Sequence, residues 1–324
     1  EKHRLELRED RQVQTVGLFE GDVLIATMKL ILFSMNCFGR MQTACGLMAL
    51  EVHPLHKKQG AALEMIRYFE DYARRHGALL TLLLPFQISF YRRMGYGFAG
   101  KLYEYHLPTA VLPKPDGEAR RHLRLLQPGD FDRVLACHSR FAAQNHGMVE
   151  KFEEEVRAAR TDVQVRRIGY CADDGTLRGY VAYRFESASD TNYTRNRLSV
   201  EELVYDDGVV LRALLGALKL QEDLAQTVRL RTGEEDFHHL LEDPQDVSGN
   251  YIDYGFLQTN VSAIGTMFKL LDPAAFVTAT AYRTLPQGTL TAAFCYRDEL
   301  AHRDCRTVLR FDGGRWSALP EEAP

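Results

Sequence analysis

The sequence predicts an α/β (α+β) fold in which a mixed sheet flanked by helices occurs twice and is followed by a third, incomplete α/β domain. Two observations lead to this prediction. Short apolar segments bounded by glycine, proline and aspartate turns alternate with amphipathic helical segments. The order strand, hairpin, strand, helix, strand then occurs in both halves of the chain, as in a diverged duplication.

The first half is expected to begin with the end of a helix, because residues 1–11 are densely charged. Its strands are expected at residues 12–19, 23–33, 47–52, 78–84 and 98–106. Its helices are expected at residues 60–76 and 89–94. The longer helix is predicted because apolar residues recur at steps of three and four from Ala62 to Ala73, and Gly77 follows it where a glycine ends many helices.

A segment rich in proline and charge, residues 108–121, is interpreted as a linker between the halves. Strands of the second half are expected at residues 124–126, 166–172, 179–185, 198–205 and 228–232. Its helices are expected at residues 130–141, with Asp130 as N-cap, and 209–222. A third segment has strands expected at residues 289–296 and 306–311. We therefore expect domains at residues 1–107, 122–262 and 263–324.

The bulk composition excludes several classes of function. Lys and Arg number 40 against 44 Asp and Glu, a net charge of −4, which argues against a nucleic-acid partner or a membrane surface. No apolar run reaches the ~18 residues that a membrane span needs. The six scattered cysteines favour free thiols in the cytoplasm. No metal site is expected, because the adjacent residues His238 and His239 point ~100° apart on a helix and form a surface pair.

The most informative stretch runs from Leu50 to Gly97. An apolar strand ends in a basic turn that contains Lys57 and Lys58, and Gly60 then opens an amphipathic helix. A helix N-terminus has unpaired N–H groups and partial positive charge, and a glycine there lets a phosphate approach the backbone. Cations at this end oppose the helix dipole, and a bound anion relieves that conflict. The stretch therefore predicts a pyrophosphate site.

The second copy differs at the same place. Its strand, residues 200–205, runs into the acidic turn Asp206-Asp207-Gly208. An acidic turn repels phosphate, so we expect a single site for this ligand in the chain.

The spacing Lys57-x-x-Gly60-x-Ala62 resembles the Gln/Arg-x-x-Gly-x-Gly/Ala signature of the GNAT superfamily of acetyl-CoA-dependent N-acetyltransferases, with lysine in place of the first residue. The motif FYRRMGYG, after an apolar strand and a proline, resembles the bacterial Eis (enhanced intracellular survival) family of GNAT proteins. That family has a catalytic N-terminal GNAT domain, a degenerate central GNAT domain and a C-terminal sterol-carrier-protein-like domain. The resemblance implies these identities for the three expected domains, with the beginning of the first and the end of the last missing.

The resemblance also assigns a cofactor site. In the family, pantetheine lies between two splayed strands, here residues 47–52 and 79–84. Backbone amides near Leu50 and Val52 are then expected to bind the pantetheine and polarise the thioester carbonyl. The family's pyrophosphate loop corresponds to Lys57, Lys58, Gly60, Ala61 and Ala62.

Tyr91 matches the family's general acid, which protonates the departing CoA thiolate. A phenol with a pKa near ~10 still holds its proton at neutral pH and suits a thiol leaving group. The alternative is a core tyrosine whose hydroxyl has a backbone partner. Tyr96 is expected to pack in a tight turn. Glu51, which alternates away from the pantetheine face, is a weaker candidate for the general base than for an exposed carboxylate.

By resemblance, the chain is an N-acetyltransferase that moves acetyl from acetyl-CoA to a primary amine, with an aminoglycoside or another polyamine as the first candidate. The family also implies a homo-oligomer, a hexamer. In the family a C-terminal carboxylate serves as the base, and this group is expected well beyond Pro324. Without it, the alternative is a non-catalytic acyl-CoA-binding regulator or a carrier of an apolar ligand.

Overall fold

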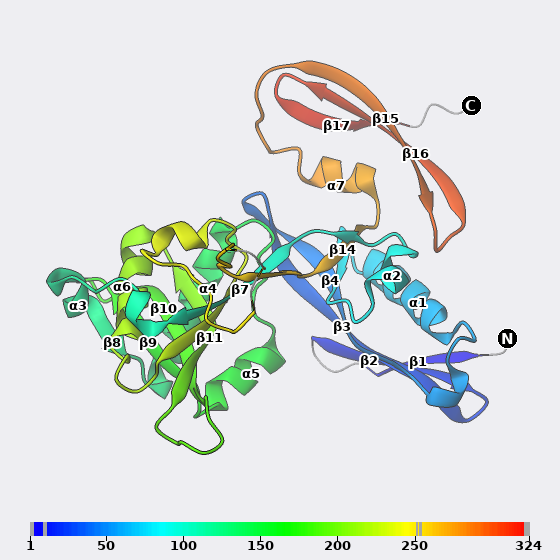
Figure 1. Cartoon of the computed structure of the whole chain (residues 1–324). Helices are drawn as coiled ribbons and strands as arrows, with labels where there is room; N and C mark the ends of the chain where they lie inside the picture. Colours follow the sequence, from blue (N-terminus) through cyan, green and yellow to red (C-terminus); the bar gives the residue numbers. More distant parts are fainter. Residues whose placement is uncertain (1–2, 9–11, 251, 253–254, 321–324) are drawn as a thin grey trace. The chain divides into compact units, whose positions relative to one another are not determined.

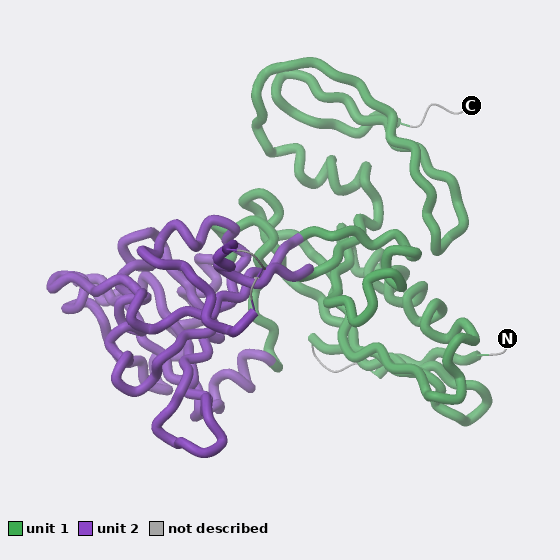
Figure 2. The backbone as a smooth tube through the Cα atoms, viewed as in Figure 1, with its two compact units in different colours: residues 1–99, 142–154, 265–324 green, residues 100–141, 155–264 purple. Residues whose placement is uncertain are grey.

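The computed structural model describes residues 3–8, 12–250, 252 and 255–320 (Figure 1). The chain forms two compact units (Figure 2). Unit 1 comprises residues 1–99, 142–154 and 265–324, and unit 2 comprises residues 100–141 and 155–264. Each unit contains one seven-stranded sheet.

The sheet of unit 1 has the strand order β1-β2-β3-β4-β5-β14-β6. These strands are β1 (Arg4–Arg8), β2 (Val13–Glu20), β3 (Val23–Cys37), β4 (Arg40–Val52), β5 (Leu80–Leu83), β6 (Gly97–Phe98) and β14 (Met267–Leu270). Neighbouring strands are antiparallel except β4 and β5, which are parallel. A parallel pair needs a crossover connection, and helix α1 (Ala61–Arg75) supplies it. The predicted mixed sheet flanked by helices is confirmed.

The helix end expected within residues 1–11 is wrong where the structure describes this segment. Arg4–Arg8 is a strand that pairs antiparallel with β2, from Arg4 opposite Phe19 to Arg8 opposite Thr15. Leu5 and Leu7 are separated by one residue, which suits a strand, and Leu5 packs against the core. The charges around them are exposed edge residues rather than a helix terminus. Residues 1–2 and 9–11 lie outside the described part.

The predicted helices of the first half are confirmed. The buried face of α1 includes Met65, Ile66 and Phe69, which pack in the core of unit 1. Gly60 is its N-cap, and Gly77 follows the C-cap with a φ of 71°. A turn of 3-10 helix, η1 (Pro54–His56), precedes α1, and the short helix α2 (Ile88–Arg92) follows β5.

The sheet of unit 2 has the order β13-β7-β12-β11-β10-β9-β8. These strands are β7 (Lys101–Pro108), β8 (Leu123–Leu125), β9 (Arg166–Cys171), β10 (Leu177–Ser187), β11 (Asn196–Tyr205), β12 (Thr227–Thr232) and β13 (Val261–Ile264). Its helical elements are η2 (Thr109–Val111), α3 (Gly117–His122), η3 (Pro128–Asp130), α4 (Phe131–Gln144, whose last residues belong to unit 1), α5 (Glu153–Thr161), α6 (Gly208–Lys219) and η4 (Phe237–Leu240). As in unit 1, a single parallel pair, β11 and β12, is joined across a helix, α6.

The segment interpreted as a linker, residues 108–121, has structure of its own. It contains η2 and most of α3, and Leu112 and Ala119 are buried in the core of unit 2. Pro113 and Pro115 lie in the segment between η2 and α3, while Leu112 and Ala119 belong to the core cluster that includes residues of α6. Composition alone does not separate such a segment from an exposed linker.

β7 and β14 each lie in a different sheet from the strand that precedes them in the chain. The sequence predicts one strand over residues 98–106, but β6 ends at Phe98 and β7 pairs with β12 and β13 in unit 2. In return β14, which follows β13, lies between β5 and β6 in unit 1. We describe this arrangement as an exchange of strands, with β14 as the exchanged strand in unit 1. Figure 2 shows by its colours where the chain passes from one unit to the other.

The rest of the C-terminal segment contains α7 (Pro273–Ala279) and a three-stranded antiparallel sheet. Its strands are β15 (Thr289–Asp298), β16 (Arg303–Asp312) and β17 (Arg315–Leu319), and the first two confirm the predicted pair. The start of this segment, β14, belongs to the sheet of unit 1. The bounds of the three expected domains stay a prediction.

Candidate active site

Two strands of unit 1 separate at the centre of its sheet. β4 and β5 pair only from Ala44 opposite Leu80 to Leu47 opposite Leu83, where β5 ends. β4 continues to Val52, and a bulge opposite Met28 places Ala49 at a φ of 49°. The N–H of His53, just beyond β4, donates to the carbonyl of Ile25, on the side of β3. Because backbone donors alternate sides, the N–H of Val52 faces the side left open by β5.

A pocket of about 910 Å³ opens at this separation. It is large enough for a sizeable small-molecule ligand, since such sites span roughly 300–1,000 Å³. The residues predicted to bind the cofactor all line it: Leu50, Val52, Lys57, Lys58, Gly60, Ala61 and Ala62. The structure thus brings together side chains and backbone from a strand, a turn and a helix start.

The basic turn and the start of α1 form the cationic end of this pocket. Gly60 has a φ of 93°, a conformation that side chains resist, and no side chain caps the helix. The first N–H groups of α1 therefore lack a side-chain acceptor. Lys57 and Lys58 are exposed, and within the described part of the chain neither forms an ion pair. This end is suited to an anion.

The corresponding helix start in unit 2 is already satisfied. The Asp207 carboxylate accepts from the N–H groups of Val209 and Val210 at 2.9 and 3.0 Å. Nη2 of Arg178 lies 2.6 Å from the same carboxylate. These backbone donors and the guanidinium hold the pKa of Asp207 below its ordinary value. The acidic turn therefore supplies at α6 the side-chain acceptor that the start of α1 lacks.

Tyr91 lies on α2, next to the pocket rather than in its wall. Its side chain is 2% exposed, and burial raises the pKa of its phenol to about 12. Its ring makes edge contacts with Phe86 and Phe90, which do line the pocket. Among the described residues the Tyr91 hydroxyl has no hydrogen-bond partner. The ring of Tyr91 is thus packed against the aromatic residues that line the pocket.

Several lining residues were not predicted from the sequence. His56 lies with Nδ1 3.3 Å from Oε2 of Glu20, and Arg93 comes from the turn after α2. Glu51 also lines the pocket, although simple alternation directs it to the other face. The bulge at Ala49 interrupts that alternation. The signal available in the sequence was the dense run of aromatic and basic residues from Phe86 to Arg93.

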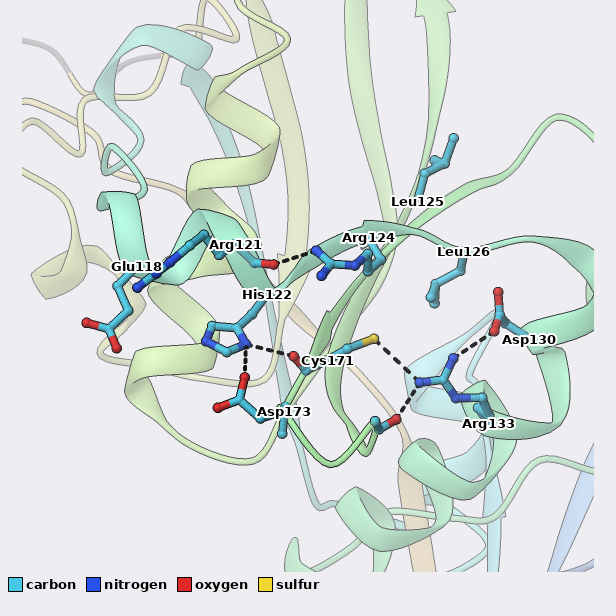
Figure 3. A pocket seen from close by; sticks show the side chains of 12 residues that line it. Glu118, Arg121, His122, Arg124, Leu125, Leu126, Asp130, Arg133, Cys171 and Asp173 are labelled. Atoms are coloured by element: carbon cyan, nitrogen blue, oxygen red, sulfur yellow. Dashed lines mark hydrogen bonds and ion pairs between the residues drawn. The ribbon is translucent and has the colours of Figure 1, made fainter.

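Unit 2 has a separate polar pocket of about 730 Å³ (Figure 3). Its Arg133 donates to Asp130 at 2.8 Å and to the carbonyl of Gly175 at 2.6 Å. Arg124 donates to backbone carbonyls, and Nδ1 of His122 lies 3.0 Å from the carbonyl oxygen of Cys171. The guanidinium groups of Arg124 and Arg133 are thus engaged within the protein.

Among the described residues, no three or more His, Cys, Asp or Glu side chains are grouped so that they could hold a metal ion. His238 and His239 lie with ring centroids 4.1 Å apart on η4. In the same part of the chain, no helix has the length and apolar character needed to cross a membrane.

Comparisons with known proteins bear on both units. Residues 1–99 match a family model described as "Acetyltransferase (GNAT) domain", and residues 147–257 match a second model with the same description. The chain therefore carries two GNAT acetyltransferase domains. No curated protein matches the chain by sequence.

Solved structures share the fold over nearly the whole chain. A probable N-acyltransferase of Enterococcus faecalis has a TM-score of 0.77 at 16% identity, covering 95% of this chain and 75% of that one. A GCN5-related N-acetyltransferase of Kribbella flavida has a TM-score of 0.72 at 22% identity, covering 96% and 73%. Eis1 of Mycobacterium abscessus has a TM-score of 0.72 at 20% identity, covering 95% and 76%. The predicted Eis-like tandem fold is confirmed.

Proposed function

We propose that this chain, a GNAT acetyltransferase with two such domains, transfers an acetyl group from acetyl-CoA to a primary amine at the pocket of unit 1. The observation that carries the proposal is the pocket itself, where strand separation, a helix start without a side-chain cap and two lysines meet, and neither lysine forms an ion pair with a described residue. An aminoglycoside or another polyamine is the first candidate for the acceptor. The resemblance further suggests a cytoplasmic homo-oligomer, a hexamer, with a sterol-carrier-like C-terminal domain.

The pocket is proposed to hold acetyl-CoA along its length. The pyrophosphate would lie at the start of α1, where backbone N–H groups and the ammonium groups of Lys57 and Lys58 supply positive charge. The pantetheine would follow the open edge of β4. Backbone N–H groups near Leu50 and Val52 would then stabilise negative charge on the thioester oxygen.

The reaction needs no covalent enzyme intermediate. The amine nitrogen, as its free base, attacks the thioester carbonyl carbon, so that a C–N bond forms and the C–S bond breaks. Tyr91 is proposed to give its phenolic proton to the departing thiolate, and the nitrogen loses a proton to a base or to water. A phenol with a pKa near 12 holds its proton at neutral pH, as this role requires.

A second candidate function is a non-catalytic acyl-CoA-binding regulator or an apolar-ligand carrier. The position of Tyr91 outside the set of pocket-lining residues favours it, because a general acid must reach the sulfur. The enzyme proposal therefore requires that α2 or its aromatic neighbours move when acetyl-CoA binds.

Thiol release from acetyl-CoA, measured with a panel of aminoglycosides and linear polyamines, separates the two candidates. The proposal predicts release that depends on the amine, together with an acetylated amine detected by mass spectrometry. Binding of CoA by calorimetry without release with any amine of the panel would favour the non-catalytic candidate. Loss of both binding and release would refute the assignment of the pocket.

A further inference from the structure

A buried polar cluster lies next to Tyr91, and none of its residues lines the pocket. It consists of Glu70 on α1, Thr81 on β5, Tyr96 and Lys269 on β14. Glu70 and Lys269 are 2% and 10% exposed at their side chains, and Tyr96 is also buried. Neither sequence motif includes Glu70 or Lys269.

The charges of this cluster are held by a close ion pair. Nζ of Lys269 lies 2.9 Å from Oε1 and 3.0 Å from Oε2 of Glu70. Asp298 contacts the same ammonium at 3.5 Å, and Arg74 reaches Glu70 at 3.2 Å. Burial raises the pKa of the Glu70 carboxyl, and the Lys269 ammonium beside it opposes that rise. Lys269 is thus the nearest cation to the buried Glu70 carboxyl and favours its charged form.

The cluster reaches the turn that follows Tyr91. The hydroxyl of Tyr96 accepts from Oγ1 of Thr81 at 3.1 Å, and its pKa is raised by burial and then by the Glu70 charge beside it. Gly95, at a φ of 88°, packs against Lys269, since a Cβ there would lie 3.3 Å from Cε of the lysine. The stem and the charge of Lys269 therefore both constrain this turn.

Residues of the same turn contact the backbone and the ring of Tyr91. The Tyr91 carbonyl accepts from the N–H of Met94 at 2.9 Å and from that of Tyr96 at 3.2 Å. The rings of Tyr91 and Tyr96 meet edge to face, with centroids 6.0 Å apart. A shift of Tyr96 or Gly95 therefore moves the backbone and the ring of Tyr91 together.

We propose that Lys269 is a positioning residue for Tyr91, acting through Glu70 and Tyr96. The inference rests on the proposed function, because it gives Tyr91 its role as general acid. It adds that the strand exchanged into this sheet, β14, is needed for proton delivery and not only for folding. Lys269 does not line the pocket of unit 1 or its cationic end. Replacing Lys269 is therefore expected to change kcat rather than the KM for acetyl-CoA.

The test uses the full chain and a neutral replacement of the pair, Glu70→Gln with Lys269→Met, which removes both buried charges and leaves Asp298 with Arg74, 3.9 Å away, as its cation. We expect kcat to fall about tenfold, since small displacements of a catalytic group cost this much or more, with the KM for acetyl-CoA unchanged within about twofold. Lys269→Arg, which keeps the charge, should retain most of kcat. Arg310→Met removes an exposed ion pair of the same unit and should leave kcat unchanged.

The decisive comparison repeats the paired replacement in a Tyr91→Phe background. If Lys269 acts through Tyr91, the replacement causes no further fall in kcat there. A kcat that is unaffected by the replacement in the wild type, or one that falls by the same factor in both backgrounds, overturns the inference. If the paired variant does not fold, Tyr96→Phe, which keeps the ring, is measured in both backgrounds with the same expectations. Full activity of Tyr91→Phe itself would instead overturn the proposed role of Tyr91.

Discussion

The ammonium of Lys269 lies 2.9 Å from Oε1 of Glu70, although 199 positions separate the two residues in the chain. The pair joins β14 to the middle of α1, the helix whose first turn forms the cationic end of the pocket. A strand that follows all of unit 2 in the sequence therefore supports the proposed acetyl-CoA site. Three of the predictions below depend on the exchanged strand or on this helix.

Lys269→Met alone should be strongly destabilising, because it leaves the buried Glu70 carboxylate with Arg74 as its remaining cation. The loss is expected at ~3–5 kcal/mol in the free energy of unfolding, the range for a broken buried pair. Adding Glu70→Gln should recover much of it. Urea unfolding of the two variants and the wild type measures this, and equal losses in both variants would contradict the role given to the pair.

Removing β14 should disrupt the sheet of unit 1. A chain ended at residue 264 loses the strand between β5 and β6 together with the buried Met267. A chain ended at residue 272 keeps both. We expect the longer variant to retain more CoA binding, measured by calorimetry, and more cooperative thermal unfolding. Indistinguishable behaviour of the two would show that the exchanged strand is dispensable.

Lys57→Glu should weaken CoA binding by at least ~1 kcal/mol, roughly fivefold in Kd, through the loss of charge-assisted contacts to phosphate. Lys114→Glu, an exposed lysine of unit 2, makes the same change of charge away from the pocket and serves as control. Calorimetric titration with CoA checks both. Unchanged affinity in the Lys57 variant would refute the assignment of the pyrophosphate end.

Gly60 and Gly208 provide a matched pair, since each stands at the start of the corresponding helix of its unit. Gly60 has a φ of 93°, whereas Gly208 begins α6 in a conformation open to any residue. Gly60→Ala should therefore cost ~1–2 kcal/mol of stability and lower CoA affinity, and Gly208→Ala should cost little. Urea unfolding and CoA titration test this; similar stability and affinity in the two variants would contradict it.

The pH dependence of turnover should reflect the raised pKa of Tyr91. An acid catalyst is active while protonated, so its loss of activity on the alkaline side follows the pKa of its phenol, here about 12 rather than the ordinary 10. Between pH 7 and ~10, the kcat of the wild type should therefore not fall through ionisation of Tyr91, so that wild type and Tyr91→Phe should have pH profiles of the same shape. A decline with an apparent pKa at or below ~10 that vanishes in that variant would contradict the burial of the phenol.

The parts of the site that could be predicted depend only on residues that are adjacent in the sequence. Lys57, Gly60 and the helix after them are adjacent in the chain, and the periodicity of α1 places them at its start. The acidic turn at Asp207, at the start of α6, could be predicted for the same reason. To predict each of these features, it is enough to know the geometry of one helix start.

The parts that could not be predicted depend on distant pairing. Lys269 reaches Glu70 only because β14 pairs with β5, and no local pattern indicates which sheet receives a strand of four residues. The pairing of Arg4–Arg8 with β2 could not be predicted, because the charged residues of this segment favoured a helix end. The burial of Tyr91 depends on where Phe86 and Tyr96 pack, which neighbouring sequence does not specify.

The most direct test of the account is the rate of thiol release by wild type and Tyr91→Phe, at saturating acetyl-CoA and with the best amine of the panel. The account predicts a kcat at least about a hundredfold lower in the variant, the scale of general acid catalysis, with CoA affinity preserved. Equal kcat values, with CoA bound equally well by both proteins, would contradict the assignment of Tyr91 as the residue that returns the proton to sulfur.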